Sequence, residues 1–77
     1  MKVMTMCKFD FSDLPTKFHN EYPFTKKDVF IYMGDITNMS GHCVVVRTKD
    51  NVIFTCYHTD DFVELNEDEL WALKKKL

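Results

Sequence analysis

GHCVVVRTKDNVIFTCYH, residues 41–58, is the most strongly patterned part of this chain. Two runs rich in β-branched and aromatic residues, 43–48 and 52–57, flank the polar tripeptide 49–51, which is the composition of a β-hairpin. A three-residue hairpin loop is a type I turn followed by one residue in the left-handed region, and after glycine Asn51 takes that conformation best. The stretch therefore predicts a hairpin that turns at residues 49–51.

This loop length also predicts the register and the two faces of the hairpin, because side chains alternate with period two along a strand. The expected opposite pairs are Val52 with Thr48, Phe54 with Val46, Cys56 with Val44, and His58 with His42. The face expected to point inward carries His42, Val44, Val46, Phe54, Cys56 and His58. The other face is half polar and is expected to point outward; it carries Cys43, Val45, Arg47, Ile53, Thr55 and Tyr57.

Size and composition indicate a single domain, residues 1–77, with a shallow core. A domain of 77 residues buries only about 60% of the surface that its unfolded chain exposes, which leaves no room for a deep cleft. The net charge of -2 argues against a nucleic-acid partner, because such proteins neutralise phosphates with lysine and arginine. The chain has three cysteines, no CxxC pair and no apolar segment long enough for a signal peptide or a membrane span. These features predict a cytoplasmic protein with reduced thiols and no membrane partner.

The segment before the hairpin, residues 1–40, shows weaker patterns. Residues 1–9 alternate as in a strand, and Ser12 is expected to cap a short helix in which Leu14 and Phe18 form a small apolar face. Residues 24–28 form a loop that leads into a strand at residues 29–33.

In that strand the pattern places Val29, Ile31 and Met33 toward the core, which leaves Phe30 and Tyr32 on the opposite side. Two explanations fit two large rings on an outer face. Either the strand is strongly coiled and both faces are covered, as in small barrels, or the rings belong to a contact surface.

The C-terminal segment begins with residues 62–65, a short strand or a one-turn helix. Asn66 is a helix N-cap and Glu69, three residues later, completes a capping box, so a helix is expected from about Glu67 to Lys76. Three leucines at helical spacing are expected to dock this helix on the sheet: Leu70, Leu73 and Leu77.

These elements predict an α+β fold that is mainly β, either a small antiparallel barrel or a curled sheet with a C-terminal helix. The strand end Gly34-Asp35, the hairpin and the closing residues 62–65 resemble those of SH3-like barrels. The resemblance covers residues 24–65, with residues 1–23 as an extension and 66–77 as the C-terminal helix. Such barrels serve many unrelated functions.

The small size and the abundance of Lys, Asn, Asp, Phe and Tyr are also similar to those of accessory proteins of bacteriophages. That resemblance implies a non-enzymatic protein that binds and modulates, or inhibits, a host protein in the host cytoplasm, as a monomer or a weak homodimer.

The expected partner surface combines aromatic and arginine side chains, the residue types that dominate interfaces. It comprises Phe30, Tyr32, Arg47 and Tyr57, with Asp60 and Asp61 in a second, acidic surface. A nucleic-acid-binding SH3-like module is the alternative, with Arg47 and Lys49 as the phosphate contacts.

A metal site is a further alternative. Imidazoles at opposite strand positions can reach one ion, so His42, His58 and Asp60 could form a set of two histidines and one carboxylate. Alternatively, the two histidines hydrogen-bond to the backbone, to each other or to nearby carboxylates. No phosphate loop, nucleophile elbow or paired-carboxylate signature is present, and the cysteines are expected to pack as small apolar residues. The sequence therefore predicts no enzyme activity and no cofactor.

Overall fold

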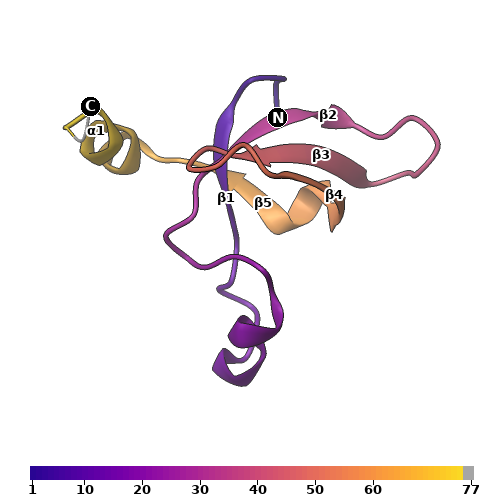
Figure 1. Ribbon diagram of the computed structural model, residues 1–77, viewed down its shortest axis with the longest axis horizontal. Coiled ribbons are helices and arrows are strands. Elements are labelled where there is room, and N and C mark those ends of the chain that lie inside the picture. Colours follow the sequence, from indigo (N-terminus) through magenta and orange to yellow (C-terminus); the bar gives the residue numbers. More distant parts are fainter. Residues whose placement is uncertain (76–77) are drawn as a thin grey trace.

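The computed structural model, which describes residues 1–75, is one antiparallel sheet with a short helix at the C-terminal end (Figure 1). The five strands lie in the order β4-β3-β2-β1-β5. The elements are β1 (Met6–Phe9), the 3-10 helix η1 (Thr16–Glu21), β2 (Phe30–Asp35), β3 (His42–Arg47), β4 (Ile53–His58), the 3-10 turn η2 (Thr59–Asp61), β5 (Phe62–Glu64) and α1 (Glu67–Lys75). The mainly β architecture is confirmed, and the sheet is open, with β4 and β5 at its two edges.

The N-terminal strand belongs to the sheet and lies between β2 and β5. It begins at Met6 and is therefore shorter than the strand expected at residues 1–9. Met4 has a φ of 75° and donates its amide hydrogen to the carbonyl of Tyr32, so the chain turns just before the strand starts. β1 is what joins the closing strand β5 to the rest of the sheet.

The hairpin of β3 and β4 is confirmed, but its loop is one residue longer than expected. Arg47 N–H donates to the Val52 carbonyl and Asn51 N–H donates to the Arg47 carbonyl, so the loop comprises residues 48–51. Asn51 has a φ of 60°, the left-handed conformation that its position in the turn requires. The longer loop shifts the strand register by one residue.

A β-bulge reverses this shift further along the hairpin. Near the turn Val46 lies opposite Ile53 and Val45 lies opposite Phe54, so the expected pairing of Phe54 with Val46 is wrong. β4 then has one residue more than β3 before the next matched positions, and His42 lies opposite His58 as expected. Cys56 falls inside this irregular segment rather than in a regular pair with Val44.

The expected faces of β2 and β3 are wrong. Phe30 and Tyr32 point into the core with Val45, and Met33 is exposed. β2 is apolar on both sides, so its face with the larger rings is buried, because aromatic side chains bury the most area. On β3, Val45 is paired with Tyr32 and lies on the same buried face. The explanation in which the rings are covered is therefore the correct one. On β4, the bulge lets both Phe54 and Tyr57 pack against the core, whereas Ile53, Thr55 and Cys56 are exposed.

Aromatic rings fill most of the core. The Phe9 ring lies 4.7 Å from that of Phe11, 5.0 Å from that of Phe24 and 5.5 Å from that of Phe62, measured between centroids. Phe11 and Phe24 come from the long segment between β1 and β2, whose η1 helix lies below the sheet in the view of Figure 1. This segment therefore supplies much of the core although it contains no strand.

The short helix in this segment differs from the expected one. It begins after Pro15 as a 3-10 helix and no side chain caps its start, whereas Ser12 instead donates its N–H to the carboxylate of Asp10. Leu14 is half-buried and Phe18 is exposed, so they do not form the expected apolar face.

Helix α1 has the expected start but only a loose contact with the sheet. Glu69 N–H donates to Asn66 Oδ1 at 2.8 Å and Asn66 N–H donates to Glu69 Oε1 at 3.0 Å, which confirms the capping box. The helix has no buried residue, Leu70 and Leu73 are half-buried, and the helix projects from the end of the sheet (Figure 1). The docking expected of these leucines is therefore only partial. The expected helix residues Lys76 and Leu77 lie outside the described residues.

The turn predicts the effect of two substitutions. Asn51→Gly should leave the free energy of unfolding unchanged or raise it slightly, because glycine takes a positive φ without strain. Asn51→Val should lower it by about 1 kcal/mol or more, because a β-branched residue is strained there. Chemical denaturation of the two variants checks this, and equal tolerance of both would contradict a left-handed residue in the turn.

Candidate binding surface

The structure does not assemble the expected interface of Phe30, Tyr32, Arg47 and Tyr57 on the surface. Phe30 and Tyr32 are buried. The Tyr32 hydroxyl donates to Asp35 Oδ1 at 2.6 Å, and this bond together with burial raises the pKa of Tyr32 to about 12. Tyr57 is half-buried against Phe9 and Phe24. These rings hold the core together and offer little area to a partner.

Arg47 is occupied within the chain. Its Nε and Nη2 donate to the two carboxylate oxygens of Asp50 at 3.0 and 2.8 Å, and Nη1 donates to the carbonyl of Pro23 at 3.0 Å. The guanidinium also lies over the Phe54 ring, 5.2 Å from its centroid. The hydrogen bond from Arg47 lowers the pKa of Asp50. This arginine fastens the hairpin turn to the loop before β2.

The expected acidic surface stays exposed. Asp60 and Asp61 lie in η2 between β4 and β5, and both side chains are in contact with solvent. The backbone carbonyl of Asp61 accepts a hydrogen bond from the Asp10 amide, which ties η2 to the end of β1. Within the described residues neither carboxylate makes an ion pair.

A row of apolar side chains crosses the opposite face of the sheet. Met6 lies opposite Ile31, Ile31 opposite Val46, and Val46 opposite Ile53, so that one line runs over β1, β2, β3 and β4. The first three are half-buried, and the Ile53 side chain is 62% exposed. Val44 and the exposed Met33, at the bulge of β2, extend the row toward the loop after that strand. We call this surface the outer apolar face: Met6, Ile31, Met33, Val44, Val46 and Ile53.

The sequence carries a signal for this face. Residues 29–33 and 43–46 are uninterrupted apolar runs rather than alternating ones, and such runs are typical of strands that are covered on both sides. In this chain the core covers one side only. The surplus apolar residues therefore remain on the surface.

The two histidine rings lie in contact, tilted by 38° to each other, and do not form the metal set that was the alternative. The rings of His42 and His58 lie 4.2 Å apart between centroids, and His42 Nδ1 is 3.2 Å from the carbonyl oxygen of Ser40. In residues 1–75 no group of three or more histidine, cysteine, aspartate or glutamate side chains is placed to hold a metal ion, so Asp60 does not complete a set. The geometry matches the alternative in which the histidines bond to the backbone and contact each other.

The three cysteines are free thiols in different surroundings. Burial raises the pKa of Cys7 to about 12, and burial also raises the pKa of Cys43. Both pack as small apolar residues, as expected, but the expectation that Cys43 lies on the outer face is wrong. Both thiols stay protonated at neutral pH. Cys56 is exposed, so the expectation that it lies on the inner face is wrong.

Comparison with known proteins gives no relative from which a function can be inferred. No family model matches the chain, and the searches of curated proteins and of solved structures gave no significant match. No helix among the described residues is both long and apolar enough to cross a membrane. The function is therefore argued from the surface itself.

Proposed function

We propose that this chain is a non-enzymatic protein-binding module that contacts its partner through the outer apolar face. The observation that carries the proposal is the line of Met6, Ile31, Val46 and Ile53 across neighbouring strands. The exposed face of an antiparallel sheet is ordinarily polar, and contiguous exposed apolar side chains mark interaction surfaces. Burying a fully exposed isoleucine side chain is worth about 1.5–3 kcal/mol. Ile53 is 62% exposed, so covering it yields a large part of this free energy and favours association.

The charges around the hairpin favour a protein over a nucleic acid. The nucleic-acid alternative depends on Arg47 and Lys49 as phosphate contacts. Arg47 is paired with Asp50, and Lys49 Nζ lies 3.2 Å from Asp28 Oδ1. No residue of the outer apolar face is charged. A phosphate backbone would thus find few unpaired cations here, whereas an apolar protein surface would be complementary.

The strand order supports an SH3-like fold for this module. The meander of β1 to β4 is followed by the short turn η2, and β5 then returns to pair with β1 on its free side. SH3-like barrels also place the first strand between the second and the last. The proposal puts the aromatic core inside such a curled sheet and the outer apolar face outside it.

The proposed partner is a host protein, in keeping with the resemblance in size and composition to bacteriophage accessory proteins. A module of this size acts by covering a surface of its partner and so modulates or inhibits it. The three free cysteines support a reducing compartment such as the host cytoplasm. Asp60 and Asp61 remain exposed at one end of the sheet and form the second surface in this proposal.

Affinity capture from nuclease-treated bacterial lysate tests the proposal with a variant of one exposed residue. Ile53→Lys places a charge at the β4 end of the outer apolar face, and because the side chain is 62% exposed the fold should tolerate it. A partner identified by mass spectrometry should be retained by the wild type and lost by Ile53→Lys.

Met39→Lys is the matched control. Met39 is also an exposed apolar residue, but it lies in the loop between β2 and β3. Retention of the same partner by Met39→Lys and its loss from a folded Ile53→Lys would locate the interface. Equal capture by all three proteins would refute the outer apolar face as the binding surface.

A further inference from the structure

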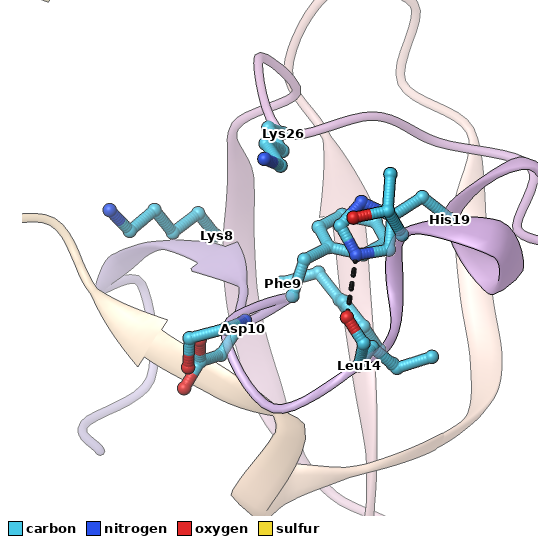
Figure 2. Close-up of a pocket in the computed structure, with 9 residues that line it drawn as sticks. Lys8, Phe9, Asp10, Leu14, His19 and Lys26 are labelled. Atoms are coloured by element: carbon cyan, nitrogen blue, oxygen red, sulfur yellow. Dashed lines mark hydrogen bonds between the residues drawn. The ribbon is translucent and has the colours of Figure 1, made fainter.

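Two pockets lie on either side of a pair of lysines, at the end of the sheet where α1 begins. A pocket of about 390 Å³ is lined by Lys8, Lys26 and the apolar residues Phe9, Phe11 and Leu14. Figure 2 shows Lys8 and Lys26 on one side of Phe9, with Leu14 and His19 on the other.

A second pocket, of about 280 Å³, is lined by the same two lysines together with Lys27 and the apolar residues Leu65, Ala72 and Leu73. We call the two pockets together the lysine groove. It borders the outer apolar face, because Lys8 follows Met6 by two residues on β1.

The carboxylates that line the groove are already engaged. Glu69 accepts from Lys8 Nζ and from the Asn66 amide, and these bonds lower the pKa of Glu69. Asp10 accepts from the Ser12 amide. Asp28 is buried and holds the Thr25 amide and Lys49. The charges of Glu69 and Asp28 are thus compensated by Lys8 and Lys49, whereas Asp10 keeps its negative charge at the edge of the first pocket.

Two lysines that line the groove, in contrast, have no carboxylate partner among the described residues. Within residues 1–75 neither Lys26 nor Lys27 makes an ion pair, and both are exposed. A protein with a net charge of -2 thus presents two lysines without an ion pair beside apolar side chains: Lys26 lines both pockets, and Lys27 lines the second. This arrangement complements a ligand that carries negative charge in its middle and apolar groups at its two ends.

We propose that the lysine groove binds an acidic segment of a partner protein in which apolar side chains flank a short run of carboxylates. The carboxylates pair with Lys26 and Lys27, and the apolar side chains enter the pockets formed by Leu14 and by Leu73. Binding also orders α1, because the ligand covers a helix that otherwise has no buried residue. The inference does not depend on the outer apolar face.

A synthetic peptide in which leucines flank a run of glutamates is the probe. It should shift the amide NMR signals of Lys26, Lys27, Ala72 and Leu73, and slow hydrogen exchange in α1. The affinity should fall as salt is raised, because exposed charge pairs are screened. A peptide with glutamines in place of the glutamates should not bind detectably.

A double variant, Lys26→Gln with Lys27→Gln, should weaken binding roughly fivefold, because each exposed charge pair contributes modestly. Lys2→Gln with Lys17→Gln removes the same charge elsewhere and should bind like the wild type.

Three results with the peptide would overturn the proposal: the absence of peptide binding, an equal loss in both double variants, and shifts that map outside the groove. A fourth test uses inorganic phosphate alone. If phosphate reproduces the shifts and the peptide binds no better, the groove is a site for small anions and the proposal is also overturned. None of these results bears on the capture experiment with Ile53→Lys, so the two proposals stand or fall separately.

Discussion

Replacing Phe30 by alanine should remove about 3–5 kcal/mol of unfolding free energy, which is most of the stability of a domain this small. The Phe30 side chain is 0% exposed, and its ring lies 5.2 Å from that of Phe24 and 5.5 Å from that of Phe62, between centroids. Truncation leaves a cavity among rings that are held by β2, β5 and the segment between β1 and β2. The variant should be largely unfolded at room temperature. Far-UV circular dichroism during urea denaturation measures this, whereas Trp71, 62% exposed on α1, is a poor probe of the core.

Ile31→Ala is the matched control, because Ile31 is the next residue on the same strand and lies on the outer apolar face. It is only half-buried, and its truncation should cost about 1 kcal/mol. A large loss of unfolding free energy in Phe30→Ala and a small loss in Ile31→Ala would establish which face of β2 packs in the core. The opposite order would restore the assignment expected from the sequence and undermine the binding surface proposed above.

Local signals in the sequence predicted the elements well. The left-handed Asn51 and the capping box of Asn66 and Glu69 each depend on residues only a few positions apart. Residues 62–65, expected as a strand or a one-turn helix, contain the strand β5. Interactions within one turn or loop determine such features, so tertiary packing seldom overrides the prediction. The same holds for the existence of the hairpin.

Which face of each strand is buried could not be predicted from alternation. Residues 29–33 and 43–46 are apolar on both sides, and period-two patterns distinguish faces only when one side is polar. The size of the Phe30 and Tyr32 rings decides which face of β2 is buried. These rings pack in the core with those of Phe9, Phe24 and Phe62. The expected interface depended on the wrong face, and the outer apolar face was missed for the same reason.

The pairing of His42 with His58 was predicted correctly although the intermediate step was wrong. The loop is one residue longer than expected, and the bulge in β4 adds one residue back. The error in loop length alone shifts the pairs near the turn by one residue. At the open end of the hairpin the bulge cancels this shift. This bulge accompanies the packing of both Phe54 and Tyr57 against the core. No local sequence motif predicts it.

Asp28, which sequence patterns place only in a loop, should prove important for stability. Its side chain is 7% exposed, and Oδ2 accepts the Thr25 amide at 2.9 Å while Oδ1 lies 3.2 Å from Lys49 Nζ. Arg47 Nη1 is 3.7 Å from Oδ2, so this carboxylate joins the loop before β2 to the hairpin turn. Asp28→Ala should cost about 2 kcal/mol, because it removes hydrogen bonds to a charged group and leaves the Thr25 amide without its partner.

The pH dependence of stability separates the charge of Asp28 from its shape. Burial raises the pKa of Asp28, but the Thr25 amide, Lys49 and Arg47 outweigh it and hold the pKa below its usual value. A carboxyl whose pKa is lowered by folding stabilises the protein above its unfolded pKa of about 3.9, and this stabilisation is lost as the pH falls through the folded pKa. Asp28→Asn keeps an acceptor for the Thr25 amide but cannot titrate. Urea denaturation at a series of pH values from about 7 to about 2 should therefore show a shallower acid loss of stability in Asp28→Asn than in the wild type. Parallel curves for the two proteins would mean that the charge of Asp28 contributes nothing to the fold.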